Sequence, residues 1–102
     1  MTRERLDNRR TSVVFDFEAM GMRTASASRY SDGRLGELFL DIHKAGSAIG
    51  TLVRDAAIIL SFALQHGADV EAIRRALCRD SQGRPLGPIG VALDKLASEE
   101  FP

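Results

Sequence analysis

The stretch LGELFLDIHKAGSAIGTLVRDAAIILSFALQHG, residues 35–67, decides the fold because the spacing of its apolar residues changes halfway along it. In its first part Leu38 and Leu40 occupy alternate positions, which is typical of a strand with two different faces. From Ser47 onward, apolar residues surround most of the circumference of a helix that ends at Gly67, a common helix-stop residue. The sequence therefore predicts a strand followed directly by a long, buried helix.

Two further strands are expected before this stretch. Residues 12–19, SVVFDFEA, are β-branched and aromatic on one side and acidic on the other, and residues 23–30, RTASASRY, alternate small apolar and polar side chains. Asp32-Gly33 then separates two extended runs, which is a strong signal for a tight hairpin. We expect three consecutive strands to form an antiparallel sheet.

Two shorter helices are expected after Gly67. Residues 68–80, ADVEAIRRALCRD, have Asp69 as a helix cap, and residues 88–98, PIGVALDKLAS, start with Pro88 at the first helical position. The predicted fold class is α+β: a three-stranded antiparallel sheet followed by a long buried helix and two shorter helices.

The composition indicates one globular domain. The chain has 102 residues, of which 44% are apolar, a size and content typical of a single packed core. We expect residues 12–102 to form that domain. Residues 1–11 are charged and lack an apolar period, so we expect them to form a flexible basic arm.

The charge balance and the polar start exclude several classes of function. Lys+Arg and Asp+Glu both number 14, so the net charge is zero and duplex nucleic acid is not an expected partner. Residues 1–10, MTRERLDNRR, lack the apolar core of a signal peptide, and the longest apolar run, AAIILSFAL at 56–64, is short for a membrane span. We expect a soluble, cytoplasmic protein without membrane contact.

The corner HKAGS, residues 43–47, is the candidate ligand site. Unpaired N–H groups at a helix start sit at the positive end of the helix dipole, where they attract phosphate or carboxylate. There Gly46 permits a close backbone approach, Ser47 can cap or donate, Lys44 adds a positive charge, and His43 flanks them. The corner is not a Walker loop, and the alternative is that it only caps the helix.

Three more polar residues are candidates for the same anion or nucleotide site. Arg54 and Asp55 interrupt an otherwise apolar helix, so they form either a structural ion pair or a polar notch that holds a phosphate and a ribose hydroxyl. Arg84 lies in the loop SQGRPLGP, residues 81–88, from which it either closes over a ligand or stays in solvent. With Thr51 and Gln65, the pair at 54–55 forms the narrow polar strip of the long helix.

Catalytic and metal motifs are not recognised in this chain. The single cysteine, Cys78, has no Cys-x-x-Cys partner, and His43 and His66 lie too far apart in sequence for a typical ligand pair. Nucleophile motifs such as Gly-x-Ser-x-Gly are missing. We expect no catalytic residues, no metal site and no cofactor.

Residues 36–77, GELFLDIHKAGSAIGTLVRDAAIILSFALQHGADVEAIRRAL, resemble the TSCPD domain. This domain is found at the C-terminal end of adenosylcobalamin-dependent (class II) ribonucleotide reductases and as small free-standing proteins. The short stand-alone alphaproteobacterial type, which begins much like RERLDNRR at 3–10, is similar as well. The resemblance implies a nucleotide-related context and a functional surface at Lys44, Gly46 and Ser47.

The chain departs from the family at the motif that names it. Where the family has Thr-Ser-Cys-Pro-Asp, this chain has RPLGPIGVAL at 84–93, with Pro88 kept and Gly87 in place of the cysteine. A thiol or metal role at that point is therefore not expected. The chain also has no room for the reductase barrel, its cysteine set or a cobalamin site.

Three functions remain open at this point. The first is a small non-catalytic nucleotide-associated binding or regulatory module, the second an oligomeric sponge that sequesters cyclic-nucleotide or ADP-ribose-type signals, and the third an accessory subunit that docks on a ribonucleotide reductase. A homodimer or higher homo-oligomer is expected in each case, because a three-stranded sheet has two open edges and the long helix exceeds what one small sheet covers.

Overall fold

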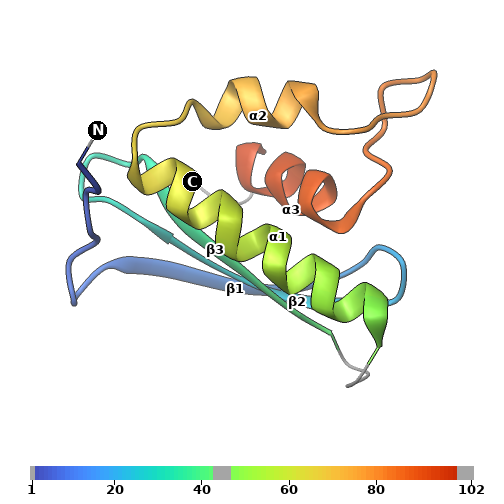
Figure 1. The fold of residues 1–102 in the computed structure, drawn as a ribbon, viewed down its shortest axis with the longest axis horizontal. Coiled ribbons are helices and arrows are strands. Elements are labelled where there is room, and N and C mark those ends of the chain that lie inside the picture. Colours follow the sequence, from blue (N-terminus) through green and yellow to red (C-terminus); the bar gives the residue numbers. More distant parts are fainter. Residues whose placement is uncertain (1, 43–46, 99–102) are drawn as a thin grey trace.

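The chain folds as a three-stranded antiparallel sheet followed by three helices, which confirms the predicted fold class (Figure 1). The structure is a computed structural model, and it describes residues 2–42 and 47–98. Its elements, in chain order, are β1 (Thr11–Glu18), β2 (Met22–Arg29), β3 (Leu35–Ile42), α1 (Ala48–Gln65), α2 (Val70–Ala76) and α3 (Pro88–Ala97).

The sheet is a simple meander in which the strand order equals the chain order. Its register aligns Phe15 with Ala25 and Ala25 with Leu40, so these side chains share the face that the helices cover (Figure 1). Ser26 and Phe39 are aligned on the opposite face, where Phe39 is exposed. The alternation read from the sequence therefore assigns the correct side of the sheet to the core.

Both turns of the meander contain residues with positive φ. Gly33 has a φ of 93° in the predicted hairpin turn, and Met20 has a φ of 56° in the turn between β1 and β2. The buried guanidinium of Arg23 fixes the latter turn, donating from Nε to the Ala19 carbonyl at 3.1 Å and from Nη2 to the Met20 carbonyl at 2.6 Å. Within the described residues, Arg23 has no carboxylate partner.

The core lies between the inner face of the sheet and two of the helices, α1 and α3. Leu38 and Leu40 from β3 and Leu93 from α3 are its largest fully buried side chains. Ala25 and Ala27 of the middle strand are also buried in this core.

Helix α1 covers the outer edge of β3 through two polar side chains. The Ser61 hydroxyl accepts the Leu38 N–H at 2.9 Å and lies 3.0 Å from the Leu38 carbonyl, while Gln65 Nε2 donates to the Gly36 carbonyl at 3.0 Å. Ser61 and Gln65 are both buried. Gln65, which the sequence assigns to the narrow polar strip of the helix together with Thr51, Arg54 and Asp55, is buried, and its amide bonds to the strand edge. One of the two open edges expected for the sheet is thereby covered at Gly36 and Leu38.

The described part of the expected arm, residues 2–10, contacts the end of α1 through Arg3 and Glu4. The Glu4 N–H donates to the Gln65 carbonyl at 2.7 Å, and Arg3 Nε donates to Gln65 Oε1 at 2.6 Å. Gly36 permits this approach, since a Cβ at that position would lie 2.7 Å from Leu6 Cδ2. The flexibility expected for the arm stays a prediction.

An ion-pair cluster joins α2 and the following loop to α3. The Asp94 carboxylate accepts from Arg79 at 2.8 and 2.9 Å and from Arg74 at 3.1 Å. The hydrogen bonds from Arg79, reinforced by those from Arg74, lower the pKa of the Asp94 carboxyl below its ordinary value near 3.8. The cluster is partly exposed, and it fixes α2 against α3.

Replacing Asp94 by Asn is expected to lower the free energy of unfolding at pH 7 by on the order of 1 kcal/mol, because the charge-assisted hydrogen bonds are lost from a partly solvated site. Since the pKa of Asp94 is depressed in the folded chain, its contribution is fully present above the unfolded pKa and disappears as the pH falls through the folded one. Urea denaturation at pH 7 and at pH values below about 4 measures both effects. Asp7→Asn, at an exposed position, is the matched control. A difference between wild type and Asp94→Asn that stays constant over this pH range would contradict the prediction.

Candidate functional site: the start of α1 and the pocket beside it

The start of α1 carries the predicted anion corner. His43, Lys44 and Gly46 lie outside the described residues, and only Ser47 of the corner is described. Ser47 is the N-cap of α1, and its hydroxyl accepts the Gly50 N–H at 2.9 Å. The capping alternative for Ser47 is thus observed, while binding of an anion at residues 43–47 stays a prediction.

Two N–H groups in the first turn of α1 have no hydrogen-bond partner in the described part of the chain. The Thr51 N–H is satisfied by the Ser47 carbonyl, whereas the N–H groups of Ala48 and Ile49 have no partner among the described residues. The turn contains no acidic residue, so no side-chain carboxylate from that turn neutralises the positive end of the helix dipole. This end of α1 is electrostatically suited to a negatively charged group.

Arg54 and Asp55 are both exposed and point to different sides of α1, because consecutive residues on a helix are separated by about 100°. Within the described part of the chain, neither side chain forms an ion pair. The structural pair considered from the sequence is therefore not observed there. Arg54 and Asp55 do not form one polar notch by themselves.

Arg84 is engaged within its own loop. Its Nε donates to Asp80 Oδ2 at 2.9 Å, and its backbone N–H donates to Asp80 Oδ1 at 2.9 Å. In Figure 1 the outer tip of the loop between α2 and α3 lies away from the first turn of α1. The described geometry does not bring Arg84 beside Ser47.

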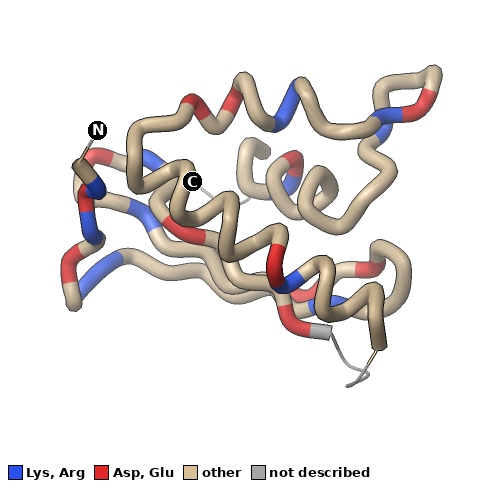
Figure 2. The backbone as a smooth tube through the Cα atoms, viewed as in Figure 1, with Lys and Arg blue, Asp and Glu red and all other residues tan. Residues whose placement is uncertain are grey.

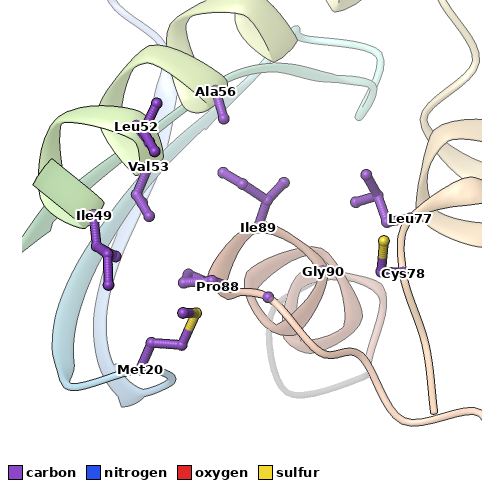
Figure 3. Close-up of a pocket in the computed structure, with 11 residues that line it drawn as sticks. Met20, Ile49, Leu52, Val53, Ala56, Leu77, Cys78, Pro88, Ile89 and Gly90 are labelled. Carbon is purple, nitrogen blue, oxygen red and sulfur yellow. The ribbon is translucent and has the colours of Figure 1, made fainter.

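An apolar pocket of about 350 Å³ opens beside the first half of α1. Figure 3 shows its walls: α1 on one side, the first turn of α3 at the base, the segment after α2 opposite, and the turn between β1 and β2 below. The lining residues are Met20, Ile49, Leu52, Val53, Ala56, Leu77, Cys78, Gly87, Pro88, Ile89 and Gly90. Sequence reasoning missed this pocket, because its residues come from four segments and carry no common motif.

Helix α1 leaves a large apolar face uncovered. Leu52 and Ile59 are 68% and 69% exposed, and Ile49, Ile58 and Phe62 are each nearly half exposed. In Figure 2 most of α1 lacks charged residues, whereas Lys, Arg, Asp and Glu occur more densely around the N-terminal arm and the strand ends. By length and composition α1 would also suffice to cross a membrane, but this is weak evidence because core helices of soluble proteins pass the same test.

Side chains that could bind a metal ion or act as a thiol are few in the described part of the chain. Residues 2–42 and 47–98 contain no group of three or more His, Cys, Asp or Glu side chains placed to hold a metal ion. Cys78 is exposed at the rim of the pocket. The described site is thus an apolar pocket next to a helix start whose first two N–H groups have no partner among residues 2–42 and 47–98.

A small α+β domain with such a site is similar to one region of much larger enzymes. The chain is 32% identical over 88 residues, 85% of its length, to the vitamin B12-dependent ribonucleotide reductase of Bradyrhizobium diazoefficiens (strain JCM 10833 / BCRC 13528 / IAM 13628 / NBRC 14792 / USDA 110). It is 36% identical over 70 residues, 68% of its length, to the enzyme of the same name from Agrobacterium fabrum (strain C58 / ATCC 33970). The enzyme of that name from Rhodopirellula baltica (strain DSM 10527 / NCIMB 13988 / SH1) is 38% identical over 72 residues, 70% of the chain.

These similarities make the chain a ribonucleotide reductase-related domain. The chain spans only 6–7% of the length of these curated relatives. No family model matches it, and no solved structure is significantly similar to it. The narrower TSCPD assignment stays a prediction.

Proposed function

We propose that this chain is a small non-catalytic module that binds a nucleotide or another phosphate-bearing molecule and acts in the context of a ribonucleotide reductase. The reductases to which it is similar are named for ribonucleotides, and the similar segment makes up only a small part of each. A binding or regulatory role suits a segment of that size better than the whole reaction does.

The observation that carries the proposal is the electrostatic character of the start of α1. The Ala48 and Ile49 N–H groups are unpaired among the described residues, and the first turn lacks an acid. Arg54 is exposed about two turns further on. Helix N–H groups with nearby arginines are the usual means of holding phosphate.

The proposal predicts a thermal shift with one class of nucleotide. The probes are ADP, ATP, dATP, cyclic di-AMP and ADP-ribose, each added to the full chain at millimolar concentration. A ligand present at a hundred times its dissociation constant stabilises by about 2.7 kcal/mol, which is a shift of several degrees for a domain of this size. Lys44→Glu and Arg54→Glu should each weaken binding of the effective nucleotide at least about tenfold, because each replaces a positive by a negative charge at the proposed site.

Arg75→Glu is the matched control, since Arg75 is an exposed arginine on α2 away from the start of α1. The proposal requires that Arg75→Glu keep wild-type affinity. Equal losses in all three variants would indicate a general charge effect and contradict a site at α1, and no shift with any nucleotide would contradict nucleotide binding. The sponge function stays a prediction, and tight binding with recovery of the intact ligand would distinguish it from the other functions. Docking on a reductase also stays a prediction.

A further inference from the structure

The exposed face of α1 carries a regular apolar stripe. Ile49, Leu52, Ala56, Ile59 and Phe62 follow one another at spacings of three or four residues, which keeps them on one side of the helix. This spacing is the one by which two helices pack along a seam. None of the five is fully buried within the single chain.

We propose that the stripe is covered by α1 of a second copy of this chain, running antiparallel. The argument is the symmetry of the stripe about its centre, between Asp55 and Ala56. Ile49 and Leu52 lie at the same distances before this centre as Phe62 and Ile59 lie after it. A twofold axis there places Leu52 of each copy beside Ile59 of the other, and an interface of this kind must be self-complementary.

The same pairing closes the apolar pocket. Ile49 and Leu52 belong both to the stripe and to the pocket wall (Figure 3). In the antiparallel arrangement Ile59 and Phe62 of the second copy lie at the level of Leu52 and Ile49, over the mouth of the pocket. Each copy therefore supplies apolar side chains that complete the pocket of the other, and the small Ala56 lets the two helices approach near the axis.

The available area is sufficient for a dimer. From their exposed fractions, the four large apolar side chains of the stripe, Ile49, Leu52, Ile59 and Phe62, offer roughly 400 Å² per copy, which is within the range of the largest apolar patches on monomers. Two copies then bury roughly 800 Å² through these side chains, and Ala56 and the 59% exposed Met20 at the edge of the pocket bring the total toward the roughly 1,000 Å² that a specific interface needs. The pairing does not depend on nucleotide binding.

Light scattering on the full chain without nucleotide tests the proposal. The wild type, with a chain mass of 11.1 kDa, should have twice that mass at micromolar concentration. Leu52→Glu and Ile59→Glu should each raise the dimer dissociation constant at least about a hundredfold, because each puts a charge into the apolar seam. Val14→Glu, which changes a 66% exposed side chain on the other face of the sheet, should remain dimeric.

Crosslinking gives a second, independent test of the axis. In a Cys78→Ser background, Ala56→Cys should form a disulfide-linked dimer under mild oxidation, because the two Ala56 positions face each other near the axis. Val14→Cys in the same background should not. A wild type that is still monomeric at about 100 micromolar would overturn the proposal, and so would a dimer that neither glutamate variant weakens. Circular dichroism checks that each variant is folded.

Asp55→Ala should tighten the dimer, since the proposed axis brings the two Asp55 carboxylates near each other.

Discussion

Leu93→Ala is expected to lower the free energy of unfolding by about 2 to 5 kcal/mol, which is a large fraction of the stability of a domain of this size. Leu93 is 2% exposed and packs from α3 into the core with the fully buried Leu38 and Leu40. Removing three carbons there leaves a cavity that the sheet cannot close, because the strands are held in register by their hydrogen bonds. Urea denaturation at fixed protein concentration measures the loss.

Leu86→Ala is the control for this change. Leu86 is 58% exposed in the loop before α3, so the same chemical substitution should change stability by no more than about 0.5 kcal/mol. A Leu93→Ala protein as stable as Leu86→Ala would mean that α3 does not pack on the sheet as described.

Ser61→Ala is expected to lower the free energy of unfolding by about 1 to 3 kcal/mol, although it removes a single oxygen atom. The Leu38 N–H, whose acceptor is the Ser61 hydroxyl, is left without a partner at a buried position. The substitution also removes the hydroxyl proton that the carbonyls of Leu38 and Ala57 share as acceptors. These carbonyl oxygens lie 3.0 and 2.9 Å from Ser61 Oγ. Denaturation measures the energy, and amide hydrogen exchange at Leu38 should become faster.

Ser98→Ala is the comparison for Ser61→Ala. The Ser98 hydroxyl donates to the Lys95 carbonyl in an exposed position, where water replaces the lost bond. Equal stability of the two alanine variants would show that the hydroxyl of Ser61 is not needed at the edge of β3.

The fold was predictable because its signals are local. Strict alternation in residues 12–19 and 35–42 identifies the strands and the side of the sheet that faces the core. The Asp32-Gly33 turn and the helix stop at Gly67 then set the boundaries, and both glycines have the positive φ that such positions need. The observed elements begin and end within a few residues of the expected ones, since helix and strand ends depend on caps and neighbours.

The site was less predictable because its contacts are not local. Ser47 was placed correctly at the helix start, since a serine before an apolar run is a typical cap. The burial of Ser61 and Gln65 follows from the position of α1 along β3, which the sequence of the helix alone does not encode. Likewise, whether Arg54 pairs with Asp55 depends on what lies beside each face of α1. The pocket needs four segments to meet, which only the packed chain reveals.

The covering of β3 by Ser61 and Gln65 has a consequence for aggregation. Strand-by-strand polymerisation requires every molecule to offer two free edges, one to receive a strand and one to pass the pairing on. In the described part of this chain, α1 holds the edge of β3 at Gly36 and Leu38, whereas β1 forms the other edge of the sheet. Pairing through β1 alone stops at two molecules, so α1 opposes fibre growth as long as it stays against β3.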